Sequence, residues 1–332
     1  MIYAPIVIPT LNRRYHLQRC IESLQKCTNI NETDLFISVD YPPAEKYIKG
    51  YKEVVNFVKT FDFSGFKSFH VFYQEKNLGP YKNIEFLYQQ VQPNYDRVIL
   101  TEDDNEFAPN FLEYMNKGLT AFADNEQIIY ICANKDADWV VDKTNVALVK
   151  LCSPYGMGMW FHKKSSFENK CISMLEDKSA WRLRNILSLY LHNPRLYSIF
   201  VNSILCNNKG LFWKSNGELN FVDTVNSIFM NLTDKLCVVP IVSKSRTFGN
   251  DGSGVNMAAR EDNGTQEIDT RKSFEIENSD EVRFYKANYA VARKYMGLGY
   301  FSKPVFHAHL FVLLLLLCGN NRERFIKLLK RK

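Results

Sequence analysis

The residues of this chain best suited to chemistry are three consecutive carboxylates, Glu102, Asp103 and Asp104. They follow the short apolar run Val98–Leu100, which predicts a buried strand that delivers them to the end of a sheet. Adjacent carboxylates repel one another unless a cation neutralises them, and hard oxygen ligands suit Mg²⁺ or Mn²⁺ bridging substrate phosphates. The alternative is an acidic turn that caps the helix expected near Pro109. A cap needs only one carboxylate, which favours the metal site.

Strand and helix patterns alternate through the first hundred residues. Apolar runs predict strands at 2–9, 35–40, 69–73 and 98–100, and helical spacing of apolar residues predicts helices at 15–27, 44–61 and 79–91. This alternation indicates an α/β fold with parallel βαβ units in a doubly wound sheet. Right-handed crossovers would bring the strand ends at Pro9, Asp40 and Glu102 to one edge, where open α/β sheets bind their ligands.

Composition narrows the class of protein. The chain has 332 residues, of which 46% are hydrophobic and 14% aromatic, and this excludes general disorder. A net charge of +6 fits anionic substrates or an anionic membrane surface but is too weak to indicate nucleic acid. The eight cysteines include no Cys-x-x-Cys pair, so we expect thiols buried as small core residues in a reduced cytoplasmic setting. The six histidines show no zinc-ligand spacing.

Three later segments have patterns of their own. Residues 163–220 are helical and aromatic, which predicts a second subregion whose aromatic side chains either pack in a core, the reading we favour, or stack on acceptor sugars. Residues 249–279 are polar and predict either a functional lid or a partly disordered segment. Residues 305–318 are apolar and precede a basic tail. They are shorter than the ~20 residues that span a bilayer, so they predict either an in-plane membrane anchor or a buried helix.

Polar residues follow each of the first three predicted strands. The segment Pro9–Arg13 ends the first strand with a turn and a cation, a suitable place for a nucleotide base and its phosphates. Asp40 can accept hydrogen bonds from uracil or ribose, or serve as a turn residue before two prolines. Asn77–Gly79 combines a polar side chain with a glycine that permits close backbone approach, although a plain loop has the same composition.

Together these segments resemble the glycosyltransferase A fold, and most closely the family of β-1,2-N-acetylglucosaminyltransferase I. The acidic triplet is similar to the Glu-Asp-Asp of that family, and Glu106–Phe111 matches its Glu-x-Ala-Pro-x-Phe sequence. A second similar segment is Cys237–Gly249. The resemblance implies a Rossmann-like, mostly parallel sheet flanked by helices, with a helical acceptor-side subregion and a C-terminal apolar and basic helix.

The resemblance also implies roles for the candidate residues. Asp104 would hold the metal, Mn²⁺ or Mg²⁺, while Glu102 and Asp103 would hold the ribose or sugar and order the waters of the metal. Arg13 and Asp40 would bind the uridine. The expected nucleotide-sugar-binding residues are therefore Pro9, Thr10, Asn12, Arg13, Asp40, Asn77, Gly79, Glu102 and Asp103.

The same resemblance implies a catalytic base. Counting back from Cys237–Gly249 over the interval of the family gives Asp223, which would remove a proton from the acceptor hydroxyl. The family has two adjacent carboxylates there, whereas this chain has only one, so Glu218 is the fallback candidate. By its sequence neighbours alone, Asp223 is equally compatible with an ordinary surface position.

We therefore expect an inverting, divalent-metal-dependent glycosyltransferase that moves a sugar from a nucleotide sugar to a glycan or lipid-linked acceptor in surface polysaccharide synthesis. The expected donor is UDP-linked, with UDP-GlcNAc as a candidate. The expected organisation is a catalytic domain at 1–255, divided into a nucleotide-sugar half (1–125) and an acceptor half (126–255), a loop or lid with a helical segment at 256–303, and a membrane-associating helix at 304–332. The expected location is the cytoplasm, at the inner face of the plasma membrane, with peripheral membrane contact and no nucleic-acid partner.

Two other function classes share features with this one. A non-catalytic, membrane-associated carbohydrate-binding or assembly subunit would keep the fold but turn over no donor. A sugar nucleotidyltransferase would share the sheet and the metal-binding carboxylates. It needs a glycine-rich phosphate loop after the first strand, and residues 9–14 contain no glycine.

Overall fold

The computed structural model describes residues 3–135, 144–177, 179–193, 196–197, 199–200, 221, 223–254, 259, 264–277 and 282. The chain forms two compact units. Among the described residues, the first unit combines 3–135, 144–148, 153–165 and those of 237–284, and the second combines 149–152 and those of 166–236.

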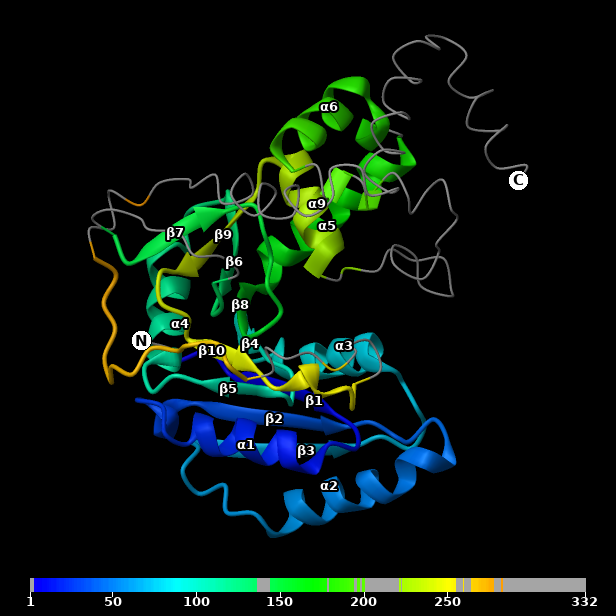
Figure 1. Ribbon diagram of the computed structural model, residues 1–332, viewed down its shortest axis with the longest axis vertical. Helices are drawn as coiled ribbons and strands as arrows, with labels where there is room; N and C mark the ends of the chain where they lie inside the picture. Colours follow the sequence, from blue (N-terminus) through cyan, green and yellow to red (C-terminus); the bar gives the residue numbers. More distant parts are fainter. Residues whose placement is uncertain are drawn as a thin grey trace. The chain divides into compact units, whose positions relative to one another are not determined.

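An eight-stranded sheet runs through the first unit in the order β3-β2-β1-β4-β8-β6-β9-β7 (Figure 1). Its strands are β1 (Ile6–Thr10), β2 (Asp34–Val39), β3 (Ser68–Tyr73), β4 (Arg97–Leu100), β6 (Ile128–Cys132), β7 (Val146–Val149), β8 (Met157–Trp160) and β9 (Leu236–Pro240). The neighbours β3, β2, β1 and β4 are parallel, with Ile6 opposite both Leu35 and Ile99. Strand β8 is antiparallel to both β4 and β6. The predicted parallel half is confirmed, and beyond β4 the sheet is mixed.

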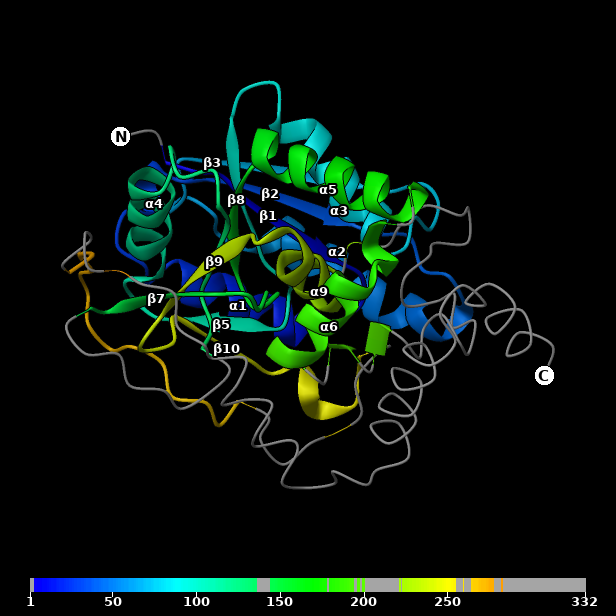
Figure 2. The same ribbon diagram turned by 90° about the horizontal axis from the view of Figure 1, so that it is seen from above.

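Three helices connect the parallel strands. They are α1 (Arg14–Leu24), α2 (Ile48–Thr60) and α3 (Pro80–Val91). Helix α1 buries Leu17, Ile21 and Leu24, the apolar positions whose spacing predicted it. Figure 2 shows α3 on the opposite side of the strands from α1, and α3 packs on β1 and β2. This is the layer arrangement that right-handed crossovers produce, so the predicted βαβ units are confirmed.

A small second sheet lies next to the acidic triplet. Strand β5 (Asn105–Phe107) pairs antiparallel with β10 (Ser245–Thr247), with Thr247 opposite Asn105. Helix α4 (Phe111–Ala121) follows β5 and packs on β6 and β8. The 3-10 helix η4 (Gly249–Asp251) follows β10. The pairing therefore brings the segment after β10 beside the residues that precede β5.

The described part of residues 249–279 is irregular and held by polar contacts. In the segment 264–277, the backbone N–H of Asp269 donates to the carbonyl of Ser243 at 2.8 Å, and Gln266 exchanges side-chain hydrogen bonds with Asn134 at 3.0 and 3.1 Å. The buried ammonium of Lys244 forms an ion pair with Asp269. These contacts fix the segment on the first unit, and its function as a lid stays a prediction.

The second unit is helical, as predicted for the described part of 163–220. Helix α5 (Phe161–Glu176) begins in the first unit, and α6 (Leu183–His192) and α9 (Asp223–Thr233) belong to the second. Helices α6 and α9 contact each other, and α9 buries Ile228 and Phe229.

Three further 3-10 turns complete the described elements. Turns η1 (Ile30–Glu32) and η2 (Glu45–Tyr47) lie in the first unit, and η3 (Ser179–Trp181) precedes α6.

Several predicted features lie outside the described residues. These are the apolar segment 305–318, the basic tail and the whole of the predicted helix at 304–332. No helix within the described ranges is long and apolar enough to cross a membrane. Six of the eight cysteines lie among the described residues and are buried, which confirms for those six the prediction of small core residues: Cys20, Cys27, Cys132, Cys152, Cys171 and Cys237.

Candidate active site

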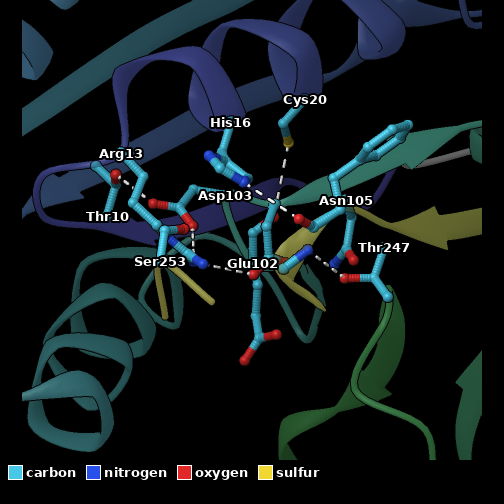
Figure 3. A network of polar contacts seen from close by, with 12 residues as sticks. Thr10, Arg13, His16, Cys20, Glu102, Asp103, Asn105, Thr247 and Ser253 are labelled. Carbon is cyan, nitrogen blue, oxygen red and sulfur yellow. Dashed lines mark hydrogen bonds and ion pairs between the residues drawn. The ribbon is translucent and has the colours of Figure 1, made fainter. Parts of the chain in front are cut away.

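Arg13, at the N-terminus of α1, contacts the carboxylates that follow β4 (Figure 3). Its guanidinium donates a hydrogen bond to Asp103 and forms an ion pair with Oδ2 of Asp104 at 2.9 Å. The hydroxyl of Thr10, the last residue of β1, donates to Oδ2 of Asp103 at 2.7 Å. Asp103 and Asp104 are only 3% and 8% exposed. The predicted meeting of the ends of the first and fourth strands at one sheet edge is confirmed.

The two carboxylates and the guanidinium form a buried charge network. Burial raises the pKa of Asp104 and the negative charge of Asp103 raises it further, while Arg13 and His16 act in the opposite direction. Burial alone would lower the pKa of Arg13, but the two aspartates outweigh it, and the pKa is raised. Arg13 therefore stays charged and compensates part of the negative charge at this edge.

One oxygen of Asp104 has no hydrogen-bond partner among the residues that the structure describes. Its Oδ1 atom is buried and unpaired, whereas Oδ2 contacts Arg13. A buried carboxylate oxygen without a donor costs free energy unless a cation or donor satisfies it. The backbone after β10 packs closely against Asp104. The N–H of Phe248 donates to the carbonyl of Asp104 at 2.8 Å, and a Cβ on Gly249 would lie 2.2 Å from its Oδ2. Only glycine leaves room there for the carboxylate.

These residues fit a divalent cation. Among the described residues, no group of three or more His, Cys, Asp or Glu side chains is arranged to hold a metal. A magnesium-like ion does not need such a cage, because it keeps several waters and takes one or two carboxylates plus substrate phosphates. Asp104, with its unpaired oxygen, has the donor chemistry that such an ion prefers.

A second cluster follows β2 and β3. Asp40 accepts hydrogen bonds from the backbone N–H groups of Tyr41, Leu78 and Gly79, at 2.9, 2.8 and 2.9 Å, and from the side chain of Asn77 at 3.1 Å. These four bonds use the acceptor sites of the carboxylate. Asp40 therefore organises the loop before α3, and a nucleotide would have to replace one of these donors. Its contact with uridine stays a prediction.

The two clusters are connected through the backbone. The N–H of Asp40 donates to the carbonyl of Thr10 at 2.9 Å. Gly79 has φ +76° and ψ 165°, a conformation that favours glycine, and Pro80 begins α3 directly after it. Residues predicted from three separate strand ends thus lie along one edge, because parallel strands direct their carboxyl ends the same way.

Three further residues of the predicted donor site are Pro9, Asn12 and Glu102. Pro9 lies in β1 opposite Ser38, and the carbonyl of Asn12 is approached closely by Gly50 of α2. The carbonyl of Glu102 accepts a hydrogen bond from the thiol of Cys20 at 3.7 Å. Figure 3 shows the carboxylate of Glu102 directed away from Asp103.

Sequence reasoning missed several residues at this edge. The imidazole Nε2 of His16 lies 3.2 Å from the carbonyl of Phe248 and 3.1 Å from Oδ2 of Asp251. A single histidine on a helix gives no sequence signal for this contact. Gly249 does have a sequence signal, since it ends the segment Cys237–Gly249 that resembles the family. Only the structure shows that it packs against Asp104.

Asp223, the predicted base, belongs to the second unit. It is the first residue of α9 and is exposed. The hydroxyl of Thr224 donates to its Oδ1 at 3.4 Å, and the hydroxyl of Ser227 donates to its carbonyl at 2.7 Å. Glu218 lies outside the described residues. The role of Asp223 as a base stays a prediction.

Solved structures and a curated protein are similar to this chain. Glucose N-acetyltransferase 1-B of Kluyveromyces lactis is 30% identical over 42% of this chain and 35% of its own length, so the chain spans about a third of that relative. Residues 1–349 of S. aureus TarS are 12% identical over 75% of this chain and 61% of that chain, with a TM-score of 0.38. Mannosyltransferase PcManGT from Pyrobaculum calidifontis, solved with GDP-Man and Mn²⁺, is 9% identical over 48% of this chain and 45% of that chain, with a TM-score of 0.36.

A family model also matches this chain. The model of the GNT-I family covers residues 1–168. This region contains strands β1 to β8, the Arg13 network and the loop that Asp40 organises. By this match over half of its length, the chain belongs to the GNT-I family.

Proposed function

We propose that this chain is an inverting, divalent-metal-dependent glycosyltransferase that transfers a sugar from a nucleotide sugar. Membership of the GNT-I family supports the reaction class. The donor we propose is UDP-linked, with UDP-GlcNAc as the first candidate, because the motifs that resemble the N-acetylglucosaminyltransferases lie at this sheet edge. The acceptor we propose is a glycan or a lipid-linked sugar used in surface polysaccharide synthesis.

The observation that carries the proposal is the buried carboxylate of Asp104. One of its oxygens is unpaired, the other contacts Arg13, and the carboxylate lies at the carboxyl edge of the parallel strands. Ligands of open α/β sheets bind at this edge. The unpaired carboxylate oxygen can hold a cation, and the charged guanidinium beside it can bind an anionic diphosphate.

The side chains divide the work of transfer between them. Asp104 would hold Mn²⁺ or Mg²⁺, which when bound supplies Lewis-acid stabilisation of the negative charge on the departing diphosphate. Arg13 keeps its positive charge beside the carboxylates and can donate to phosphate oxygens through its guanidinium. Asp40 fixes the loop Asn77–Gly79, which would border the nucleotide.

We propose Asp223 as the residue that removes the proton from the acceptor hydroxyl. A carboxylate base has to act within hydrogen-bond reach of that hydroxyl, on the face of the sugar opposite the leaving diphosphate, which inverts the anomeric centre. The resemblance of Cys237–Gly249 to the family supports this assignment. The basic tail after residue 318 supports a peripheral contact with an anionic membrane at the inner face of the plasma membrane.

The proposal is tested with a panel of UDP-, GDP- and dTDP-sugars, each with and without Mn²⁺. We expect binding and turnover of one donor class, dependent on the metal. Asp104→Ala should abolish the metal-dependent turnover while leaving the melting temperature close to that of the wild type. The matched control is Asp124→Ala, which removes an exposed carboxylate from the same unit.

A second variant separates base catalysis from donor binding. Asp223→Asn should retain Mn²⁺-dependent donor binding and lose transfer by a factor of about 100 or more, in the range of general-base contributions. Metal-dependent turnover by Asp104→Ala equal to that of the wild type would refute the metal assignment. Absence of turnover with every donor and acceptor, with binding retained, would instead favour a carbohydrate-binding subunit.

A further inference from the structure

A cavity of about 470 Å³ lies beside the acidic edge, where the first turn of α1 meets the segment after β10. Its volume falls within the roughly 300–1,000 Å³ of ligand pockets. Three arginines, one histidine and two carboxylates line it: Arg13, Arg14, Arg19, His16, Glu53 and Asp251. Figure 3 shows Ser253, another lining residue, beside Arg13.

Two guanidinium groups of this cavity have no carboxylate partner among the described residues. That of Arg19 stacks on the ring of Phe248, 3.8 Å from its centroid, and that of Arg14 lies over the rings of Tyr15 and Phe57 at 4.8 and 5.7 Å. Stacking uses the face of a guanidinium and leaves the N–H donors along its edge available. Aromatic contacts therefore hold both cations in place while their hydrogen-bond donors remain unused.

The other charged groups of the cavity are already compensated or exposed to water. Arg13 is paired with Asp103 and Asp104, and His16 lies 3.1 Å from Asp251. Glu53, on α2, is exposed. Within the described part of the chain, Arg14 and Arg19 are therefore the two arginines of the cavity that no carboxylate contacts.

We propose that this cavity binds a phosphate group at a site separate from the carboxylates that would hold the metal. Guanidinium edges match the geometry of phosphate oxygens and bind them through charge-assisted hydrogen bonds. The cavity also borders the N-terminus of α1, where the side chain of Arg13 bonds Asp103 and makes no capping hydrogen bond within the described residues, and the helix dipole there favours an anion. The phosphate belongs either to the donor nucleotide or to a phosphorylated acceptor. Phosphate binding itself does not depend on the proposed transfer.

The test is isothermal titration calorimetry with inorganic pyrophosphate in the presence of EDTA, so that no divalent metal contributes. We expect the wild type to bind, and Arg14→Gln and Arg19→Gln each to weaken binding by about tenfold, the usual effect of losing one hydrogen bond to a charged group. Lys52→Gln removes one exposed positive charge from α2 outside the cavity and should bind like the wild type. Asp104→Ala should also retain pyrophosphate binding.

Thermal unfolding shows whether each variant is folded. If Arg14→Gln does not fold, the affinity of Arg19→Gln for pyrophosphate alone decides the test. Competition then identifies the source of the phosphate. Displacement of pyrophosphate by UDP assigns the cavity to the donor, and simultaneous binding of pyrophosphate and UDP with Mn²⁺ assigns it to an acceptor phosphate. The proposal is overturned if the wild type binds no pyrophosphate, or if Arg19→Gln binds it as tightly as the wild type. Neither result depends on whether the protein transfers a sugar.

Discussion

A methyl group at Gly249 would collide with the carboxylate that we propose holds the metal. Its Cβ would lie 2.2 Å from Oδ2 and 2.9 Å from Cγ of Asp104, and the next neighbour, Oγ1 of Thr247, is 3.4 Å away. To restore a separation of even 3.0 Å, the carboxylate or the backbone of η4 must move by about 0.8 Å. Gly249→Ala therefore acts almost entirely on Asp104.

Two effects of this substitution follow from that displacement. Overpacking of a close contact usually costs about 1–3 kcal/mol in the free energy of unfolding. A shift of nearly 1 Å in a catalytic group can lower the rate of transfer by roughly 100-fold. We therefore expect Gly249→Ala to be folded but destabilised, to bind Mn²⁺ more weakly in the presence of UDP, and to lose most of its metal-dependent turnover.

The measurements are urea unfolding, calorimetric titration with Mn²⁺ in the presence of UDP, and steady-state kinetics. Gly254→Ala is the matched control, because it makes the same substitution in the same segment and its Cβ would meet its nearest atom at 3.6 Å, an ordinary contact distance. Its free energy of unfolding should stay within about 1 kcal/mol of the wild type.

A double-mutant cycle supplies the decisive result. In the Asp104→Ala background both colliding atoms are absent, and the nearest remaining atom is Oγ1 of Thr247 at 3.4 Å. Gly249→Ala should then change the free energy of unfolding by no more than about 0.5 kcal/mol. Equal destabilisation in the wild-type and Asp104→Ala backgrounds would show that the glycine is required for another reason.

Two other predictions concern the polar contacts that support the site. Burial opposes ionisation of Asp269, but hydrogen bonds from Arg271 and Lys244 outweigh this effect and hold the pKa of Asp269 below its ordinary value of 3.8. The ionised carboxylate therefore stabilises the fold above pH 3.8, and this stabilisation is lost as the pH falls towards the folded-state pKa. Asp269→Asn should therefore cost about 3–5 kcal/mol at pH 7 in urea unfolding because it leaves the Lys244 charge buried, with a smaller cost near pH 3 and partial recovery when Lys244→Met is added. An equal cost at both pH values would contradict the ion-pair explanation. Gly79→Ala should cost about 1–3 kcal/mol from backbone strain alone, since φ is +76° and its Cβ would meet nothing within 4 Å. Gly65→Ala, at a position with no positive φ, is the control, and equal costs for the two variants would exclude strain as the cause.

Most of the parallel half of the sheet was predictable from short-range patterns. Buried parallel strands such as β2 are continuous apolar runs, and helices such as α1 repeat their apolar residues every three or four positions. The ends of the elements were less accurate. The strand predicted at 2–9 is Ile6–Thr10, and the helix predicted at 15–27 ends at Leu24. End positions depend on capping and on tertiary contacts, which a periodic pattern does not contain.

The antiparallel elements were not predicted. Strands β5, β8 and β10 have three or four residues each, too few for an alternating pattern to be recognised. Their pairing depends on partners far along the chain, as when β10 joins β5. This pairing brings Phe248 and Gly249 to Asp104, so sequence reasoning missed the contacts that these short strands create.

The sequence by itself determined that an acidic triplet follows a buried strand, and that the predicted strand ends at Pro9, Asp40 and Glu102 share one edge. Such features are encoded locally, in the apolar runs and in the handedness of the crossovers. Only the tertiary structure decided which oxygen of Asp104 is left without a partner, that Arg13 compensates the two aspartates, and that all four acceptor sites of Asp40 are used within the protein. The physical reason is that charge compensation, desolvation and steric room depend on distances through space, and these join residues that are far apart in the sequence.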